Sequence, residues 1–379
     1  MYPTKKLWEI CDLYQPKTIS IKDMIEDWEY PVFWANWIIW KYNQYNHENE
    51  EILITCRWAT CWTINISEKF SWINGNAMVS HIKDEKELNF YYLYYFFKNT
   101  DFSKIISGSA QPQITRQWLV AIPIPLPPLS TQQKIISKLD SLFEKLDQAI
   151  TLTKQNLANI EELNKSVLEK IFKECEEKYE KRKLGEVCNK ITDWSHNPPK
   201  WIETWYPMIS ARNLTDFNEI IFDNLRFLSE NDYLLENKRT DVKDWDILLS
   251  IVWTIWKICI VKEEYWKFVM QRSLAVFKLN KNFLHSKFTY FYFKSDFIQK
   301  LLNNSAIWAT QKWIYLKDLK QISIPLPPLS EQQKIVEYLD NIFAKNKTLQ
   351  DKCKQDLQNL EELKQSILKQ AFENEDFIK

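Results

Sequence analysis

Apolar side chains recur at steps of three and four residues from position 136 to position 171, a stretch without glycine or proline. This spacing is typical of a long helix with a heptad seam, which polar Thr153 and Asn164 interrupt. At 1.5 Å per residue, a helix of about 43 residues would be roughly 65 Å long. Three seam positions are expected to lie in the core of a helix pair: Leu139, Phe143 and Leu157.

The same pattern returns 200 residues later in the chain. The segment "IPIPLPPLSTQQKIISKLDSLFEKLDQAI", which starts at Ile122, is repeated as "ISIPLPPLSEQQKIVEYLDNIFAKNKTLQ", which starts at Ile322. An internal repeat of this kind predicts two long helices, which most simply pack on each other. The alternative is that each helix covers only its own domain. The core positions expected in the second helix are Leu339, Phe343 and Leu357.

Each copy of the repeat opens with a proline-rich segment that cannot be helical. A serine follows in each copy, three residues before a glutamine, which is the spacing of a capping box at a helix start. The pairs are Ser130 with Gln133 and Ser330 with Gln333. Helices are therefore expected to begin at these two serines.

The segments that precede the helices also begin alike, with "KLWEIC" at 6–11 and "KLGEVC" at 183–188. Further on, 52–66 resembles 247–261, and both read as a strand, a turn and a second strand. The expected fold is mixed, α+β or α/β, with two globular domains related by an approximate two-fold internal repeat. The domains are 1–129 and 183–329, and the helices at 130–182 and 330–379 pack between them as an antiparallel coiled coil.

The chain has 18 Trp and only 3 Gly, whereas an average chain of this length carries roughly 25 Gly. Every Trp lies in the two globular segments, and Trp8 stands where the second copy has Gly185. Glycine has a reason to avoid long helices, and tryptophan has none as strong. We therefore hypothesise that most of these Trp positions, including the three in "VFWANWIIWKYN" at 32–43, are glycine in a lineage that translates UGA as glycine. Trp72 is the position most readily kept as tryptophan.

The remaining composition excludes several classes of site. Lys and Arg number 50, as do Asp and Glu, so the net charge makes no case for or against a nucleic-acid partner. The seven Cys form no CxxC pair and the four His lack ligand spacing with them, which predicts buried thiols in a reducing cytoplasm and no metal site. No apolar run is long enough to span a bilayer, and the first residues do not read as a signal peptide.

These motifs resemble the specificity subunit of type I restriction-modification systems over nearly the whole chain. The most specific match is the pair "IPIPLPPLSTQQKI" and "ISIPLPPLSEQQKI", each before a long helix. "WINGNAMV" and "SAQPQITRQWL" support it in the first half, and "DWSHNPPK" and "ATQKWIYLKDL" in the second. The chain departs from the family where Trp replaces Gly.

The resemblance implies a protein without catalytic residues that recognises a bipartite, asymmetric site on double-stranded DNA, one half-site per domain. The helices would set the number of unread base pairs between the half-sites. Two methyltransferase subunits and the restriction (helicase–nuclease) subunits would be its partners. S-adenosylmethionine, ATP and Mg would be cofactors of those partners, with none in this subunit. The expected location is the cytoplasm, with no membrane contact.

Base readout requires Arg or Lys for guanine and Asn or Gln for adenine, delivered from loops. A solvated side chain or a phosphate contact is the alternative at every such position. "TRQ" at 115–117 and "TQK" at 310–312 occupy equivalent places and rank highest. The candidate DNA-binding residues are Asn36, Lys41, Arg57, Gln111, Gln113 and Arg116 in the first domain, and His196, Lys200, Arg212, Asn213, Arg272, Gln311 and Lys312 in the second.

Two other functions are open at this point. "NPPK" at 197–200 is similar to the Asn-Pro-Pro-aromatic motif of amino-methyltransferases, but Lys200 replaces the aromatic residue and no glycine-rich loop precedes it. A stand-alone DNA amino-methyltransferase is therefore the weaker alternative. The other is a structural or partner-docking rod protein that does not bind DNA.

Overall fold

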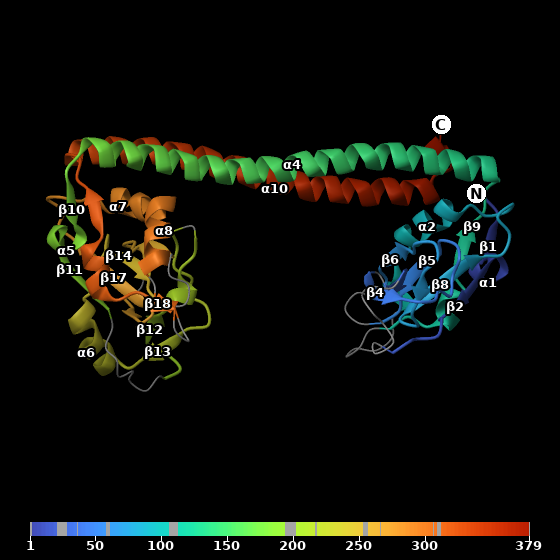
Figure 1. Cartoon of the computed structure of the whole chain (residues 1–379), viewed down its shortest axis with the longest axis horizontal. Coiled ribbons are helices and arrows are strands. Elements are labelled where there is room, and N and C mark those ends of the chain that lie inside the picture. Colours follow the sequence, from blue (N-terminus) through green and yellow to red (C-terminus); the bar gives the residue numbers. More distant parts are fainter. Residues whose placement is uncertain are drawn as a thin grey trace. The chain divides into compact units, whose positions relative to one another are not determined.

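The computed structural model describes residues 2–20, 29–35, 37–57, 61–105, 113–193, 202–216, 218–252, 257–265, 267–305, 307–308 and 312–378. The chain divides into two compact units, unit 1 (1–154 with 354–379) and unit 2 (155–353). Helices and strands alternate in both, so the mixed fold expected from the sequence is confirmed (Figure 1). In the described part of the chain, no helix is both long and apolar enough to cross a membrane.

Unit 1 holds a four-stranded antiparallel sheet, a three-stranded sheet and a two-stranded ribbon. The four-stranded sheet has the order β2 (Cys11–Tyr14), β8 (Ala77–Ile82), β5 (Ile52–Thr55), β6 (Ile64–Ile66). The three-stranded sheet has the order β4 (Ile38–Tyr42), β3 (Tyr30–Phe33), β7 (Trp72–Ile73), and the ribbon joins β1 (Thr4–Lys6) to β9 (Pro123–Pro125). The short helices are α1 (Leu7–Ile10), α2 (Phe90–Asn99), η2 (Phe102–Ile105), α3 (Arg116–Leu119) and η4 (Glu375–Ile378).

Unit 2 repeats this topology. Its four-stranded sheet has the order β11 (Cys188–Asp193), β17 (Leu274–Leu279), β14 (Ile247–Ser250), β15 (Ile258–Ile260). Its three-stranded sheet has the order β13 (Arg226–Leu228), β12 (Tyr206–Ile209), β16 (Val269–Met270), and β10 (Lys181–Lys183) pairs with β20 (Ser323–Pro325). The remaining elements are β18 (Ile307–Trp308), β19 (Lys312–Trp313), α5 (Leu184–Val187), η3 (Ala211–Asn213), α6 (Glu230–Thr240), α7 (Ser286–Lys294), α8 (Asp296–Ser305) and α9 (Leu316–Gln321). The internal repeat predicted from the sequence is therefore present in the fold.

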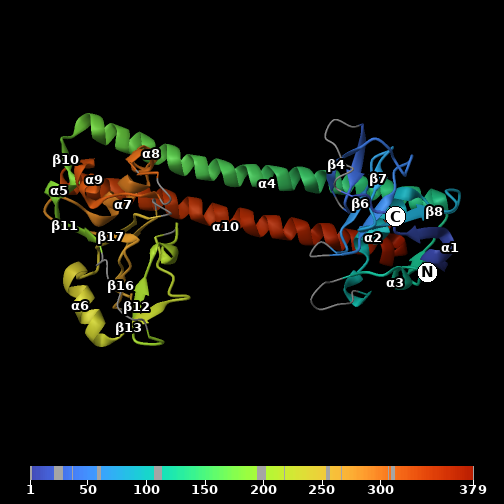
Figure 2. The ribbon, with the colours of Figure 1, turned by 60° about the horizontal axis from the view of Figure 1, so that its bottom comes forward.

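Two long helices, α4 (Leu129–Lys178) and α10 (Leu329–Glu373), contribute to both units (Figure 2). In unit 1 the first turns of α4 lie against the last turns of α10, where Lys364 Nζ is 2.7 Å from a carboxylate oxygen of Asp147. In unit 2 the end of α4 lies against the start of α10, and Asn346 Nδ2 donates to Asn164 Oδ1 at 2.6 Å. The pairing is antiparallel in each unit. Asn164, which interrupts the heptad seam of the first helix, thus has a polar partner on the second helix.

The unit division falls inside α4 and α10, because each unit includes the helix ends that pack on it. The domain boundaries predicted at 129, 182 and 329 separate the helices from the globular segments, a division that the two units do not test. These boundaries stay predictions. Of the core positions expected in the helices, Leu139, Phe143 and Leu339 are buried, whereas Leu157, Phe343 and Leu357 are half-buried.

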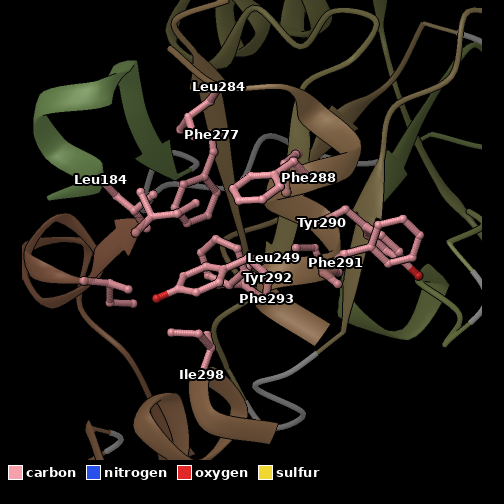
Figure 3. Close-up of a cluster of buried hydrophobic side chains, with 14 of the residues drawn as sticks. Leu184, Leu249, Phe277, Leu284, Phe288, Tyr290, Phe291, Tyr292, Phe293 and Ile298 are labelled. Atoms are coloured by element: carbon pink, nitrogen blue, oxygen red, sulfur yellow. The ribbon is translucent and has the colours of Figure 1, made fainter. Parts of the chain in front are cut away.

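An aromatic residue near the end of each long helix enters a core of the fold. In unit 2, Phe172 of α4 packs edge-on against Phe288 and Tyr292 of α7, with ring centroids 5.4 and 5.2 Å apart. Figure 3 shows the surrounding cluster, in which the two α7 rings lie among apolar side chains from the sheet, from α5 and from α8. In unit 1, Phe372 of α10 packs against two rings of α2, tilted against Tyr92 at 5.2 Å and edge-on against Phe96 at 5.8 Å. Each unit therefore needs the start of one long helix and the end of the other.

A fully buried glutamine fastens the start of each long helix to its unit. Gln132 Nε2 donates to the backbone carbonyls of Glu87 and Pro127, both at 2.9 Å. Its Oε1 accepts from the backbone amide of Asn89 at 2.8 Å. One side chain thus makes hydrogen bonds to three backbone groups, two just before α2 and one in the proline-rich segment. This pattern joins the proline-rich strand, the entry to α2 and the first turn of α4.

Gln332 repeats this arrangement in unit 2. Its Nε2 donates to the carbonyls of Phe283 (2.7 Å) and Pro327 (2.8 Å), and its Oε1 accepts from the His285 amide (2.9 Å). The predicted capping boxes are not formed, because the helices begin one residue earlier, at Leu129 and Leu329. The first glutamine of each "QQ" pair, rather than the second, makes the contacts that the helix start depends on.

Three tryptophans occupy backbone conformations that favour glycine. Trp62, Trp205 and Trp245 have φ of 75°, 109° and 70°, and the three residues are 48%, 67% and 44% exposed. A bulky residue at positive φ is strained, whereas glycine is not. Trp8, at the position of Gly185 in the repeat, is 54% exposed. These observations support the hypothesis that glycine is the native residue at such positions. The backbone amide of Trp34 also donates to the Trp37 carbonyl, a tight turn of the kind in which glycine is common.

Replacing Trp245 by Gly should raise the free energy of unfolding by about 1 kcal/mol, because the left-handed conformation costs a side-chain-bearing residue about that much. Urea unfolding of the full chain measures the change. Trp72→Gly is the control, since Trp72 packs edge-on against Tyr42 with centroids 5.1 Å apart, and its loss should destabilise the fold. Equal destabilisation by both substitutions would contradict the glycine hypothesis.

Replacing Gln132 by Ala should lower the free energy of unfolding by about 2 kcal/mol, because three backbone groups lose the partner that this fully buried side chain provides. Gln133→Ala is a matched control, as the neighbouring side chain is exposed and surface changes typically cost under about 0.5 kcal/mol. The pair Gln332→Ala and Gln333→Ala provides the same comparison in unit 2. Similar unfolding midpoints for the two members of a pair would show that the buried amide is dispensable.

Candidate nucleic-acid interface

The structure places seven of the thirteen candidate DNA-binding side chains. They are Lys41, Arg57, Gln113, Arg116, Arg212, Asn213 and Arg272. Asn36, Gln111, His196, Lys200 and Gln311 lie outside the described residues. Lys312 lies in β19, but its side chain is not among those described.

Three of the candidates in unit 1 lie close together at the end of β5. Arg57 and Gln113 face each other across a β-bridge, and the Ile114 amide donates to the Cys56 carbonyl at 3.0 Å. Arg116 follows at the start of α3, with its Nε donating to the Leu13 carbonyl at 2.5 Å. Two arginines and one glutamine, all exposed, therefore lie on neighbouring segments, with the Arg116 Nε directed to β2. Lys41 lies apart from them in sequence and sheet, on β4.

The equivalent bridge in unit 2 joins Val252 to Trp313, with the Ile314 amide donating to the Ile251 carbonyl at 3.0 Å. The backbone arrangement is the same as in unit 1, but an apolar pair replaces Arg57 and Gln113. The two units therefore present different chemistry from the same framework position.

Polar side chains in unit 2 gather instead around a cavity of about 280 Å³. Its lining includes the predicted Arg212 and Asn213, and also Asp223, Arg226 and Gln271, which sequence reasoning missed. Arg226 and Gln271 are of the residue types that read bases, but nothing in their local sequence indicated a shared cavity. Arg272 is exposed and follows Gln271 directly.

Asn213 is buried and uses its whole amide inside the protein. Its Oδ1 accepts from the Ser210 amide (3.0 Å) and hydroxyl (2.9 Å), and its Nδ2 donates to the carbonyls of Ile221 (3.0 Å) and Asp223 (3.3 Å). These four bonds fill the capacity of the side chain. Its position therefore suits holding two segments together better than reading a base.

A second polar group lies in unit 1, within the sheets rather than at the predicted interface. Tyr14 Oη and His47 Nε2 are 2.8 Å apart, and His81 Nδ1 lies 2.8 Å from a buried Glu51 carboxylate oxygen. Burial, with a smaller contribution from the charge of His81, lowers the pKa of His47 to about 4. Burial also raises the pKa of Glu51, against the opposing hydrogen bond and charge of His81.

The described residues contain no group of three or more His, Cys, Asp or Glu side chains that could hold a metal ion. The cysteines are free, and burial raises the pKa of Cys11, Cys56, Cys188 and Cys259 to about 12. Thiols with such pKa values stay protonated and act as apolar packing groups.

The family model for the type I restriction modification DNA specificity domain matches residues 2–162 and 176–359. The type I restriction enzyme EcoBI specificity subunit of Escherichia coli is 28% identical over 281 residues, which cover 66% of this chain and 58% of that protein. The MjaVIII specificity subunit of Methanocaldococcus jannaschii is 28% identical over 311 residues, which cover 76% of this chain and 73% of that protein. The chain thus spans little more than half of the E. coli relative.

Two solved structures share the fold. A chain from a study of complex assembly and conformational transition in a type I R-M system superposes with a TM-score of 0.76, at 18% identity and covering 98% of both chains. The HsdS subunit of Thermoanaerobacter tengcongensis superposes with a TM-score of 0.58, also at 18% identity, covering 98% of this chain and 97% of that one.

Acid should destabilise the fold partly through His47. A histidine whose pKa is lowered on folding contributes stability that is present above its ordinary pKa of 6.5 and lost as the pH falls toward about 4. By linkage the loss at pH 5 is about 2 kcal/mol. Glu51, with its raised pKa, acts in the opposite direction as the pH falls and offsets part of this loss.

Urea unfolding of the wild type and of His47→Gln between pH 7.5 and pH 5 isolates the histidine, because Glu51 is present in both proteins. The variant should lose less stability over this range. Parallel pH profiles would exclude His47 as a source of the acid sensitivity.

Proposed function

Since the chain belongs to the type I restriction modification DNA specificity family, we propose that it recognises DNA sequence without catalysis and that each unit reads one half of a bipartite target. Unit 1 would present Arg57, Gln113 and Arg116 to its half-site. Unit 2 would present the polar side chains around its cavity.

One observation carries this proposal: the two units share a topology but differ in the side chains at equivalent surface positions. Arg57 and Gln113 in unit 1 correspond to Val252 and Trp313 in unit 2. The turn after β7 reads Asn74-Gly75-Asn76, whereas the equivalent turn after β16 reads Gln271-Arg272-Ser273. Similar frameworks with unlike surfaces support two different half-sites and an asymmetric target.

We also propose the partners and the place of action. Double-stranded DNA, two methyltransferase subunits and restriction subunits would bind this chain in the cytoplasm. Those partners would use S-adenosylmethionine, ATP and Mg for the chemistry. The antiparallel ends of α4 and α10 would set the number of unread base pairs between the half-sites.

The two alternative functions are not favoured. Membership of the specificity family leaves no reason to treat the chain as a rod that does not bind DNA. The motif at 197–200, which suggested a methyltransferase, lies outside the described residues, and relatives named specificity subunits match the chain instead.

Expressing the chain with its methyltransferase subunits and mapping methylated adenines by long-read sequencing tests the proposal. We expect one bipartite motif that disappears when this gene is deleted. Exchanging residues 1–129 for the matching domain of a relative should change one half of the motif and leave the other half and the spacer unchanged. Methylation that persists without this gene, or a chimera that alters both halves, would contradict independent reading by two domains.

A further inference from the structure

The 280 Å³ cavity of unit 2 brings together segments that are distant in sequence. Ser210 follows β12, Arg212 and Asn213 belong to η3, Asp223 precedes β13, and Gln271 follows β16. The ends of two strands of the three-stranded sheet and the approach to the third therefore surround one concave surface.

Arg212 and Asp223 offer opposite hydrogen-bonding chemistry at this surface. Both residues are exposed, and among the residues that the structure describes neither side chain has a hydrogen-bond or ion-pair partner. A guanidinium only donates and an ionised carboxylate only accepts. The cavity thus has a fork of donors and a pair of acceptors available to a ligand.

Asn213 fixes the relation between these two side chains. It is adjacent to Arg212 in η3, and its Nδ2 donates to the Asp223 carbonyl. The Ile221 amide donates in turn to the Asn213 carbonyl at 2.8 Å. The segments that carry the arginine and the aspartate are therefore held together by a buried residue, as a preorganised recognition surface requires.

Two successive hydrogen bonds hold Gln271 at the same cavity. The Ala211 amide donates to Ser273 Oγ (3.1 Å), and that hydroxyl donates to Gln271 Oε1 (3.3 Å). Because the serine occupies the oxygen of the amide, the nitrogen is the end available for donation. The turn after β16 is thereby tied to η3.

The equivalent turn of unit 1 is built differently. The Gly75 amide donates to Thr18 Oγ1 at 3.2 Å, and the Pro16 carbonyl oxygen lies 2.6 Å from where a Cβ on Gly75 would be. Pro16 and Thr18 therefore cover this turn, and no side chain fits at Gly75, the position that Arg272 occupies in unit 2. The chemistry of the cavity is specific to one half of the molecule.

We propose that Arg212 and Asp223 read one G·C base pair in the half-site bound by unit 2, with Asn213 as their positioning residue. The Arg212 fork would donate to guanine O6 and N7, and Asp223 would accept from the cytosine 4-amino group, which are the pairings that these groups favour in the major groove. A phosphate fits less well, because it offers only acceptors and Asp223 would repel it. This inference rests on the proposed function.

The test uses the full chain in complex with its methyltransferase subunits, and duplexes of the mapped motif in which each G·C pair of the unit 2 half-site is replaced by A·T. For one of these replacements, the wild-type complex should bind the altered duplex at least about fivefold more weakly than the unaltered duplex. Arg212→Ala and Asp223→Ala should each reduce this discrimination, because each removes one of the two base contacts and leaves the other. Lys238→Ala, an exposed cation on α6 outside the cavity lining, should keep the wild-type discrimination.

Arg212→Lys separates base from phosphate contact, since it keeps the charge and removes the fork. Loss of discrimination in this variant, with unchanged affinity for unrelated DNA, supports the base contact. Equal weakening by Arg212→Ala on every duplex, with a smaller salt dependence and an unchanged motif, overturns it. Thermal unfolding of each complex confirms that the variants are folded.

The wild-type methylation motif distinguishes failure of the inference from failure of the proposed function. The absence of a bipartite motif dependent on this gene would refute both. A bipartite motif whose unit 2 half contains no G·C pair, or whose every position survives Arg212→Ala, would overturn the inference and leave the proposed function standing.

Discussion

The buried glutamines at the start of α4 and α10 are the contacts on which the rest of the structure depends. Each binds two carbonyls and one amide from the proline-rich segment and from the entry to the aromatic helix, α2 or α7. Proline segments have few backbone donors of their own. A side chain with both donors and an acceptor is therefore suited to joining such a segment to a helix and to a recognition unit.

The long helices make each unit incomplete without sequence from the other half of the chain. Phe172 lies in the core of unit 2, although its helix begins in unit 1, and Phe372 has the reciprocal position. Burial of an aromatic ring contributes more stability than a surface contact. For the proposed function, this exchange couples both recognition surfaces to the helix pair.

The recognition surfaces depend on the framework in a different way. The framework repeats, whereas the turns after β7 and β16 and the bridges at Arg57 and Val252 do not. The proposed base-reading side chains need only an anchored backbone beneath them, such as that held by Asn213, so the turns that carry them can differ between the units. Positive φ at tryptophan occurs at other turns of the two units, at Trp62, Trp205 and Trp245.

The sequence by itself determined the two long helices, the internal repeat and the hairpins at 52–66 and 247–261, because these depend on local periodicity and on turn chemistry. It also indicated the family, through the motifs before each helix. Only the tertiary structure decided which "QQ" residue is buried, that Asn164 pairs with Asn346, and that Arg212, Asp223 and Gln271 share one cavity. Each of these facts is a contact between segments distant along the chain, and no pattern of neighbouring residues specifies such a contact.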